Sequence, residues 1–154
     1  MSVRHVGVQE AHQLQTTEGY TYVDVRSVPE YERGHPASAH NVPLLHFDSQ
    51  TGRMMPNAEF LAVMQANYST DAKLLIGCQV GGRSARAAEM LAAAGYDTAV
   101  NVKGGFGGFR DPATDSVVDD GWSQIGLPVE VGSPEGVGYE PLRQNVGGNS
   151  DTTD

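Results

Sequence analysis

The stretch Leu74-Leu75-Ile76-Gly77-Cys78-Gln79-Val80-Gly81-Gly82-Arg83-Ser84 decides the fold. Its first four residues form an apolar run typical of a buried strand, and an alanine-rich segment, 85–94, follows it. This order predicts a strand, a tight turn and a helix. Backbone N–H groups of such a turn converge, and the helix directs its positive N-terminal end toward them. Because these surroundings stabilise a thiolate, Cys78 is predicted to be a nucleophile.

Strand and helix patterns alternate on both sides of this stretch. Residues 20–25 and 98–102 are rich in β-branched and aromatic side chains, which indicates strands. Helices are expected at residues 9–15, 28–33, 57–64 and 84–94. Ser27 and Asn57 are the expected N-caps of the second and third helices, and Ser84 of the fourth. The alternation predicts an α/β fold, with a parallel sheet that carries helices on both faces.

Composition narrows the classes of function. The formal net charge of the 154-residue chain is −9, which argues against binding to nucleic acid or to an anionic membrane. Cys78 is the one cysteine, so no disulfide can form within the chain, and a free thiol suits a reducing compartment. The N-terminus shows no apolar secretory segment, and the expected location is the cytoplasm. No exposed apolar stripe stands out, so a monomer is expected.

The chain is predicted to consist of one domain and a tail. Residues 1–131 carry the strand and helix patterns, although residues 35–53 are expected to be mostly irregular, with room for a short strand around 41–43. From Pro134 the composition shifts to small and polar residues without an apolar period. Residues 132–154 are therefore predicted to be disordered.

The size of the turn helps to choose between reactions. Cysteine-based phosphatases use a Cys-x5-Arg spacing that surrounds a phosphoryl group, whereas this chain has Cys78-x4-Arg83. A smaller ring of amides suits a single sulfur atom better. Gly81 and Gly82 permit the backbone angles that converging N–H groups need. A phosphatase or arsenate reductase is the less favoured alternative, also because Gly77 and not a histidine precedes the cysteine.

These features, with others along the chain, resemble the rhodanese family of sulfurtransferases. The resemblance spans about residues 3–130. It rests on motifs that come in the family's order, namely Tyr22-Val23-Asp24-Val25-Arg26, 34–43, the Cys78 loop, 95–105 and 122–129. It implies a rhodanese-like three-layer α/β fold with a central parallel sheet of about five strands. Ser38 departs from the family pattern, because glycine is usual there.

An insertion is the largest departure from the family. The resemblance places Trp122 about four residues after the paired glycines, but here it follows Gly105 by seventeen. Residues 106–121 are therefore interpreted as an inserted segment, glycine-rich and then acidic. A surface flap without a role is favoured over a segment that shapes access to the site or binds a partner.

The resemblance implies a double-displacement reaction at Cys78. A small anionic sulfur donor such as thiosulfate leaves a persulfide on Cys78, and cyanide, a thiol or a protein then accepts the sulfur. The backbone N–H groups of six residues are expected to bind the outer sulfur, those of Gln79, Val80, Gly81, Gly82, Arg83 and Ser84. The Arg83 side chain either attracts the donor or turns outward to a carboxylate. No metal and no organic cofactor is required.

Three further residues are assigned supporting roles. Asp24 and Arg26 lie two apart on a strand, so they face the same side and are expected to form a structural polar network. His35 is expected to make a structural hydrogen bond, in preference to acting as a general base. The alternative function is a persulfide carrier or redox-sensing module with little turnover of its own.

Overall fold

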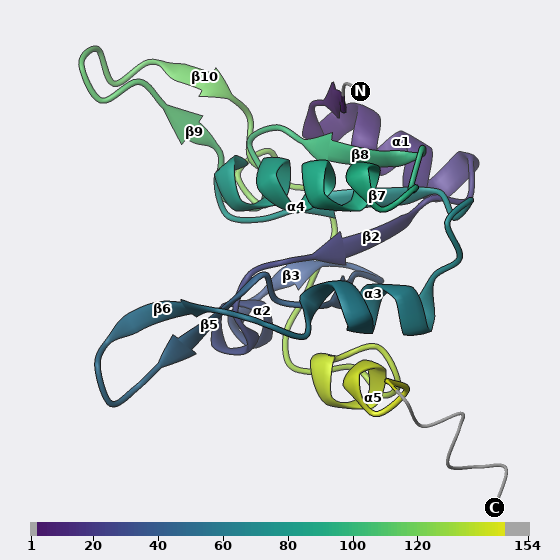
Figure 1. Cartoon of the computed structure of the whole chain (residues 1–154). Coiled ribbons are helices and arrows are strands. Elements are labelled where there is room, and N and C mark those ends of the chain that lie inside the picture. The colour runs from purple at the N-terminus through teal and green to yellow at the C-terminus, as the bar shows by residue number, and fades with distance from the viewer. Residues whose placement is uncertain (1–2, 147–154) are drawn as a thin grey trace, which may run out of the picture.

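The computed structural model describes residues 3–146. Its central sheet has five strands in the order β1-β8-β7-β2-β4, and every neighbouring pair is parallel. The strands are β1 (Arg4–Val6), β8 (Ala99–Val102), β7 (Leu74–Gly77), β2 (Thr21–Asp24) and β4 (His40–Asn41). Figure 1 shows the sheet at the centre of the molecule. The predicted parallel α/β sheet of about five strands is confirmed.

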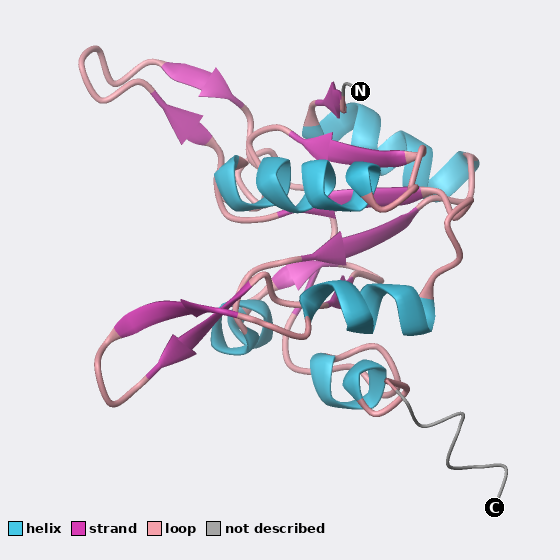
Figure 2. Ribbon diagram, in the orientation of Figure 1, coloured by secondary structure: helices cyan, strands magenta, loops and turns pink. Residues whose placement is uncertain are grey.

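Helices cover both faces of this sheet (Figure 2). One buried cluster joins the sheet to α3 (Phe60–Asn67), α4 (Gly82–Ala93) and α5 (Tyr139–Arg143). A second cluster joins it to α1 (Val8–Thr17) and α2 (Val28–Arg33). Strand residues alternate between the two, so that Leu74 and Ile76 enter the first cluster and Leu75 the second. The continuous apolar run of β7 follows from burial on both faces.

The helix ends match the sequence patterns in part. Ser27 caps α2 and forms a capping box with Glu30, as predicted for a helix that starts after Ser27. Helix α3 begins at Phe60, three residues later than expected, although Asn57 accepts a hydrogen bond from the N–H of Glu59. Helix α4 begins at Gly82, so Ser84 lies inside its first turn and is not its cap.

Three short antiparallel pairs surround the sheet. They are β5 (Leu45–Asp48) with β6 (Arg53–Pro56), β9 (Phe109–Arg110) with β10 (Val117–Asp119), and β3 (His35–Pro36) with β11 (Val129–Glu130). Residues 35–53, expected to be mostly irregular, thus contain β3, β4 and β5. The β5–β6 and β9–β10 hairpins extend to the side on which β2 and β8 end, at the left of Figure 1. The inserted segment 106–121 forms the second of these hairpins.

The expectation of a disordered tail from residue 132 is wrong for residues 132–146. Helix α5 forms there, and its Tyr139 and Leu142 are buried against α3 and the sheet. The Tyr139 hydroxyl is hydrogen-bonded to the Asn57 amide at 3.1 Å. A few apolar contacts order a segment whose composition alone is that of a loop. The rest of the predicted tail, 147–154, lies outside the described residues.

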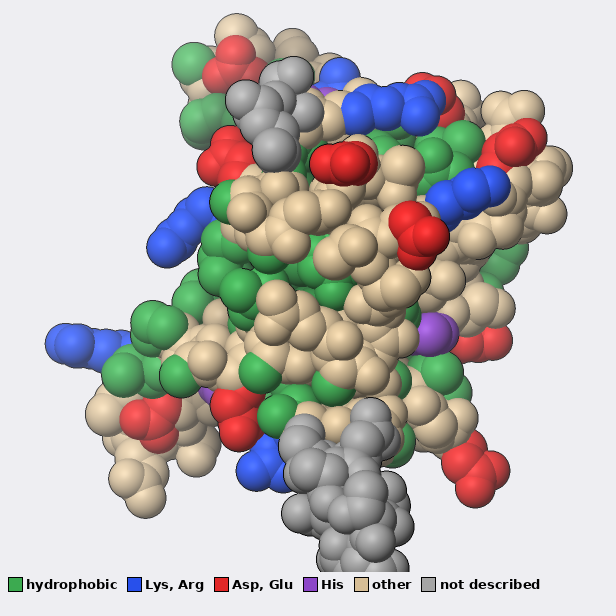
Figure 3. All heavy atoms as spheres, turned by 45° about the vertical axis from the view of Figure 1, so that its right-hand side comes forward, with side chains coloured by type: hydrophobic (Ala, Val, Ile, Leu, Met, Phe, Trp, Pro, Cys, Tyr) green, Lys and Arg blue, Asp and Glu red, His purple; other side chains and the backbone are tan. Residues whose placement is uncertain are grey.

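Acidic and basic side chains are interspersed on the face of the molecule shown in Figure 3, with hydrophobic side chains exposed between them. None of the helices described for residues 3–146 combines the length and the apolarity that a bilayer span requires.

Candidate active site

The Cys78 loop leaves the carboxyl end of β7, where open parallel sheets place their sites. Gly77 lies directly before the loop and pairs with Asp24 of β2. A Cβ atom on Gly77 would lie 1.9 Å from the Tyr22 hydroxyl oxygen, so only glycine fits there. Cys78 follows with 2 % of its surface exposed, at the edge of the core that contains α4. The Cys78 thiol is thus shielded by the loop that follows it.

Backbone amides of the loop point at the sulfur. The N–H of Gly81 donates to Cys78 Sγ at 3.1 Å, and the N–H of Ser84 donates at 3.3 Å. Gly81 has a φ of +131°, which an L-residue with a side chain rarely adopts. As a thiol, Cys78 donates to the Ser84 hydroxyl at 3.4 Å. Two of the six predicted N–H groups therefore contact Sγ itself.

The other loop residues lie around the mouth of the site. The Val80 side chain is exposed at the tip of the loop, and Gly82 begins α4 in an exposed position. Gln79 is half-buried, and its side-chain oxygen accepts a hydrogen bond from Arg26 at 3.0 Å. These positions leave the loop backbone accessible beside a buried sulfur.

A glycine-rich segment, residues 104–108, packs against the backbone of the Cys78 loop. The N–H groups of Phe106 and Gly107 donate to the carbonyl oxygens of Cys78 and Gln79, at 2.8 and 2.9 Å. Gly105 lies so close that a Cβ atom there would come within 2.2 Å of the Cys78 carbonyl oxygen. This segment is the base of the β9–β10 hairpin, so the insertion begins in direct contact with the loop.

Asp24 and Arg26 form a buried ion pair beside the loop. Arg26 Nη2 lies 2.7 Å from Asp24 Oδ2, and both side chains are almost fully buried. The guanidinium also donates to the Gly34 carbonyl and lies over the Phe106 ring, 4.5 Å from its centroid. Together with the bond to Gln79, these contacts connect β2 to the loop. The network is the structural one expected from the spacing of the two residues.

Arg83 turns away from the sulfur. Its guanidinium forms a two-pronged ion pair with Glu30 of α2, at 2.8 and 3.0 Å. Burial alone would raise the pKa of Glu30, but hydrogen bonds from Arg83 and Ser27 outweigh it and lower that pKa from 4.5 to about 2. The hydrogen bonds to Glu30 raise the pKa of Arg83 above its ordinary value. The structure thus places the Arg83 side chain on a carboxylate, one of the two positions considered.

His35 lies in the interior and away from the loop. Its ring stacks on Tyr31 with centroids 3.8 Å apart, and Nδ1 is 2.8 Å from the Tyr31 carbonyl oxygen. Nδ1 is therefore the protonated ring nitrogen and donates to that carbonyl. The side chain is fully buried. His35 makes a structural hydrogen bond of the kind expected.

A polar pocket of about 310 Å³ opens at the mouth of the loop. It is lined by Arg26, Glu30, Arg33, Gly34, Gln79 and Phe106. A larger groove of about 680 Å³ shares Glu30 and Arg33 with it and extends over the β5–β6 hairpin, where Phe47 and Met54 are exposed. The two cavities therefore adjoin at Glu30 and Arg33, beside the Cys78 loop.

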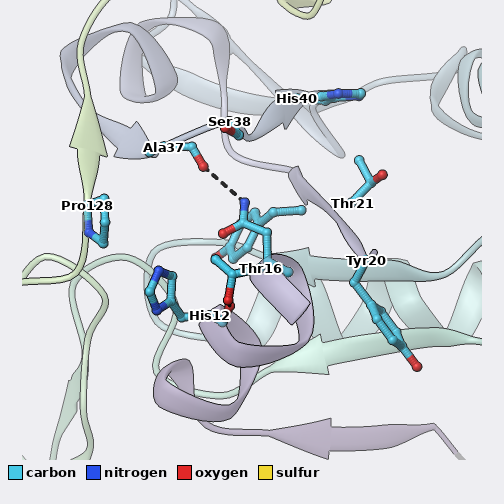
Figure 4. Close-up of a pocket in the computed structure, with 10 residues that line it drawn as sticks. His12, Thr16, Tyr20, Thr21, Ala37, Ser38, His40 and Pro128 are labelled. Atoms are coloured by element: carbon cyan, nitrogen blue, oxygen red, sulfur yellow. Dashed lines mark hydrogen bonds between the residues drawn. The ribbon is translucent and has the colours of Figure 1, made fainter. Parts of the chain in front are cut away.

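Another pocket, of about 350 Å³, lies between α1 and residues 37–40 (Figure 4). His12 and Thr16 line it from α1, and Gln15 donates to the Ala37 carbonyl at 3.0 Å. Tyr20 and Thr21, at the start of β2, form its wall. It therefore lies away from the carboxyl ends of the strands, where Cys78 is found.

Sequence reasoning missed three residues of the site. Glu30 binds Arg83, Phe106 covers Arg26, and Asn101 of β8 binds the Ser84 hydroxyl at 2.6 Å. The capping box signals Glu30, because its carboxylate must lie at the start of α2. Nothing in the local pattern distinguishes Asn101 from a surface residue of a strand. Within the described part of the chain, His, Cys, Asp and Glu side chains form no group of three that could hold a metal ion.

Comparison with known protein families agrees with the loop geometry and the parallel sheet. The sequence matches the rhodanese-like domain over residues 7–111, which is more than half of the chain. The chain belongs to the rhodanese-like domain family. The family match ends within the β9–β10 hairpin, as expected if residues 106–121 are an insertion.

Several relatives in this family are from Arabidopsis thaliana. Thiosulfate sulfurtransferase 16, chloroplastic, is 30% identical over 125 residues, which cover 81% of this chain and 91% of the relative. Thiosulfate sulfurtransferase 18 is 38% identical over 103 residues, which cover 66% and 74%. Rhodanese-like domain-containing protein 9, chloroplastic, is 33% identical over 136 residues, and the match covers 75% of this chain and 58% of that protein.

Solved structures show the same fold. The crystal structure of Rv0390 from M. tuberculosis superposes with a TM-score of 0.66 at 27% identity, covering 86% of this chain and all of that one. A rhodanese-like domain protein from Staphylococcus aureus superposes with a TM-score of 0.57 at 21% identity, covering 85% of this chain and 100% of that chain. The rhodanese-like fold expected from the sequence motifs is thereby confirmed.

Proposed function

We propose that this rhodanese-like protein is a sulfurtransferase that moves sulfane sulfur from a donor such as thiosulfate to a thiophilic acceptor through a persulfide on Cys78. The observation that carries the proposal is the pair of loop amides, from Gly81 and Ser84, that donate to Sγ. Amides in this arrangement stabilise negative charge on sulfur. Two relatives carry the name thiosulfate sulfurtransferase, which supports the same reaction.

In the first half-reaction the Cys78 thiolate attacks the outer sulfur of thiosulfate. A bond forms between Sγ and that sulfur, and the bond from the sulfur to the sulfonate group breaks. Sulfite leaves with the electron pair, and a persulfide anion remains on Cys78. Loop N–H groups that face this outer sulfur each contribute a few kcal/mol to binding its charge.

In the second half-reaction an acceptor attacks the outer sulfur of the persulfide. Cyanide becomes thiocyanate, and the Cys78 thiolate is restored for the next turnover. A thiol acceptor, on a small molecule or on a protein, takes the sulfur in the same way. Every atom comes from donor, acceptor and Cys78, so the reaction requires no cofactor.

The test is a thiocyanate assay with the full chain. Thiosulfate and cyanide should yield thiocyanate, and Cys78→Ser should abolish the product while the circular dichroism spectrum stays unchanged. Intact mass after incubation with thiosulfate alone should increase by one sulfur atom. Folded protein that gives no thiocyanate, but hydrolyses an aryl phosphate, would refute the proposal.

A second candidate is a persulfide carrier that delivers sulfur to a larger acceptor with little turnover on cyanide. The groove with exposed Phe47 and Met54 beside the polar pocket favours it, because cyanide needs no such surface. Here the mass increase on Cys78 persists, but thiocyanate forms slowly. We also propose that the protein acts as a monomer in a reducing compartment such as the cytoplasm, since its lone thiol has to stay reduced.

A further inference from the structure

A chain of three hydrogen bonds, buried except at its outer end, leads from Cys78 to the edge of the sheet. Cys78 Sγ lies 3.4 Å from Ser84 Oγ, Ser84 Oγ lies 2.6 Å from Asn101 Oδ1, and Asn101 Nδ2 lies 3.0 Å from His5 Nδ1. Asn101 is the Cα partner of Ile76 in β7 and of His5 in β1. It therefore lies beside the strand that ends at the nucleophile.

The two middle members of this chain are shielded from water. Ser84 is fully buried and 3 % of Asn101 is exposed. A buried polar group that loses its hydrogen bond destabilises the folded protein. Each proton in this series of hydrogen bonds therefore has a preferred acceptor. The direction of each bond therefore matters for the state of Cys78.

The Ser84 hydroxyl has one proton and three acceptors within reach. They are Asn101 Oδ1 at 2.6 Å, the Gly81 carbonyl at 3.1 Å and Cys78 Sγ at 3.4 Å. While Cys78 is a thiol, its S–H donates to Ser84 Oγ and the Ser84 proton goes to Asn101, the nearest acceptor. This arrangement satisfies every member of the chain.

Loss of the thiol proton of Cys78 changes which acceptor the Ser84 hydroxyl prefers. The thiolate is stabilised best when the Ser84 hydroxyl turns its proton to Sγ, beside the N–H groups of Gly81 and Ser84. That turn takes the proton from Asn101 and leaves a buried amide oxygen without a donor. Asn101 and the thiolate thus compete for one proton. An amide oxygen does not accept a proton at neutral pH, so the chain orients the hydroxyl and does not conduct protons.

We propose that Asn101 is a positioning residue, which holds the proton of the Ser84 hydroxyl away from Cys78 in the resting thiol and so limits thiolate formation. His5 supports it, because its Nδ1 accepts from Asn101 Nδ2 and keeps Oδ1 turned to Ser84. The proposal rests on the proposed function only in taking Cys78 as the nucleophile. A resting thiol held in this way is also less open to oxidation.

The test follows the rate at which iodoacetamide alkylates Cys78, the one cysteine of the full chain, as a function of pH. Asn101→Ala should move the profile to lower pH, with alkylation about 3- to 10-fold faster below the midpoint, because Ser84 is free to donate to the thiolate. Ser84→Ala should move the profile to higher pH, since it removes that donor. A merely structural role predicts no such opposite shifts.

The double variant Ser84→Ala/Asn101→Ala is decisive. If Asn101 acts through Ser84, the double variant has the profile of Ser84→Ala alone. His5→Ala should shift the profile in the same direction as Asn101→Ala, but less. Asn57→Ala removes another buried asparagine, bound to the Pro43 carbonyl and to Tyr139, and should leave the profile unchanged.

Two results would overturn the proposal. One is an Asn101→Ala profile that stays in place or moves to higher pH, and the other is an Asn101 effect that persists without the Ser84 hydroxyl. If Asn101→Ala does not fold, Asn101→Val, which suits a strand, gives the same comparison. Alkylation is measured whether or not thiocyanate forms, so failure here is distinct from failure of the sulfurtransferase proposal.

Discussion

Arg83 and Glu30 form an ion pair in which both guanidinium Nη atoms donate to the carboxylate, at 2.8 and 3.0 Å. The pair joins the first turn of α4 to α2 and lies next to the mouth of the site. Because the carboxylate neutralises the guanidinium, Arg83 itself offers little positive charge to an anionic donor. If the proposed function is correct, the loop amides and not the Arg83 side chain are expected to bind thiosulfate.

Freeing Arg83 should improve donor binding. Glu30→Gln removes the neutralising charge and leaves a cation at the mouth, so KM for thiosulfate should fall about 2- to 5-fold. The control is the uncharged variant Arg83→Gln, which leaves Glu30 unopposed and should raise KM. Steady-state thiocyanate assays measure both. A rise in KM for Glu30→Gln would show that the pair acts by ordering the loop.

Glu30 should also make the free energy of unfolding depend on pH in the acidic range. Its pKa in the folded protein is about 2, below the ordinary 4.5, so the folded state prefers the carboxylate. This contribution is complete above pH 4.5 and is lost as the pH falls toward 2. For a half-buried group it amounts to at most about 2 kcal/mol. Urea unfolding between pH 5 and 2.5 should show a shallower loss for Glu30→Gln than for the natural chain, whereas equal slopes contradict the assignment.

Ser38 occupies a backbone conformation that favours glycine. Its φ is +70°, one of two positive values among the described residues other than glycine. Ser38→Gly should stabilise the protein by about 0.5–1 kcal/mol, because relief of strain exceeds the added chain entropy. Ser38→Ala keeps the strain and is the matched control. Urea unfolding gives the free energies, and a loss of stability with glycine would refute the argument.

Gly105 should tolerate no side chain. Its φ is +56°, and a Cβ atom would collide with the Cys78 carbonyl oxygen. Gly105→Ala is therefore expected to displace the loop and reduce thiocyanate formation more than 10-fold, beyond the cost of its backbone angle. Gly126→Ala is the control, because its φ is +84° and no atom lies within 4 Å of a Cβ there. That variant should lose about 1–2 kcal/mol of stability and keep its turnover. Similar turnover in both variants would contradict a role of Gly105 in holding the loop.

Helix α5 should contribute to the stability of the whole domain. Tyr139 is 7 % exposed and packs in the core that contains α3. Tyr139→Ala is expected to destabilise the protein by about 3–5 kcal/mol, and Tyr139→Phe, which loses only the hydrogen bond to Asn57, by about 1 kcal/mol. Thermal unfolding distinguishes them. A small loss of stability in the alanine variant would show that residues 132–146 do not contribute to the folded domain.

Local patterns were sufficient for the parts of the fold that depend on neighbours in sequence. The apolar run of β7, the Ser27 capping box and the turn after Cys78 each have a signature within a few residues. Helix α5 has none, because two buried side chains, Tyr139 and Leu142, hold it in place through contacts with distant elements. The partners of Arg83 and Ser84, which are Glu30 and Asn101, lie 53 and 17 residues away. Sequence reasoning predicted the strand, the loop and the helix around Cys78 but had no means to pair these side chains.

The contacts of Phe106 and Gly107 with the loop have a consequence for its preorganisation. In a trans peptide unit the C=O and N–H bonds point in opposite directions. With the Cys78 and Gln79 oxygens bound to the hairpin base, the N–H groups of Gln79 and Val80 are aimed away from that base before any ligand arrives. The loss of entropy from ordering these N–H groups thus occurs when the protein folds and not when a ligand binds. Displacement of the β9–β10 hairpin is therefore expected to release these two carbonyl groups and to disorder the N–H groups that follow them.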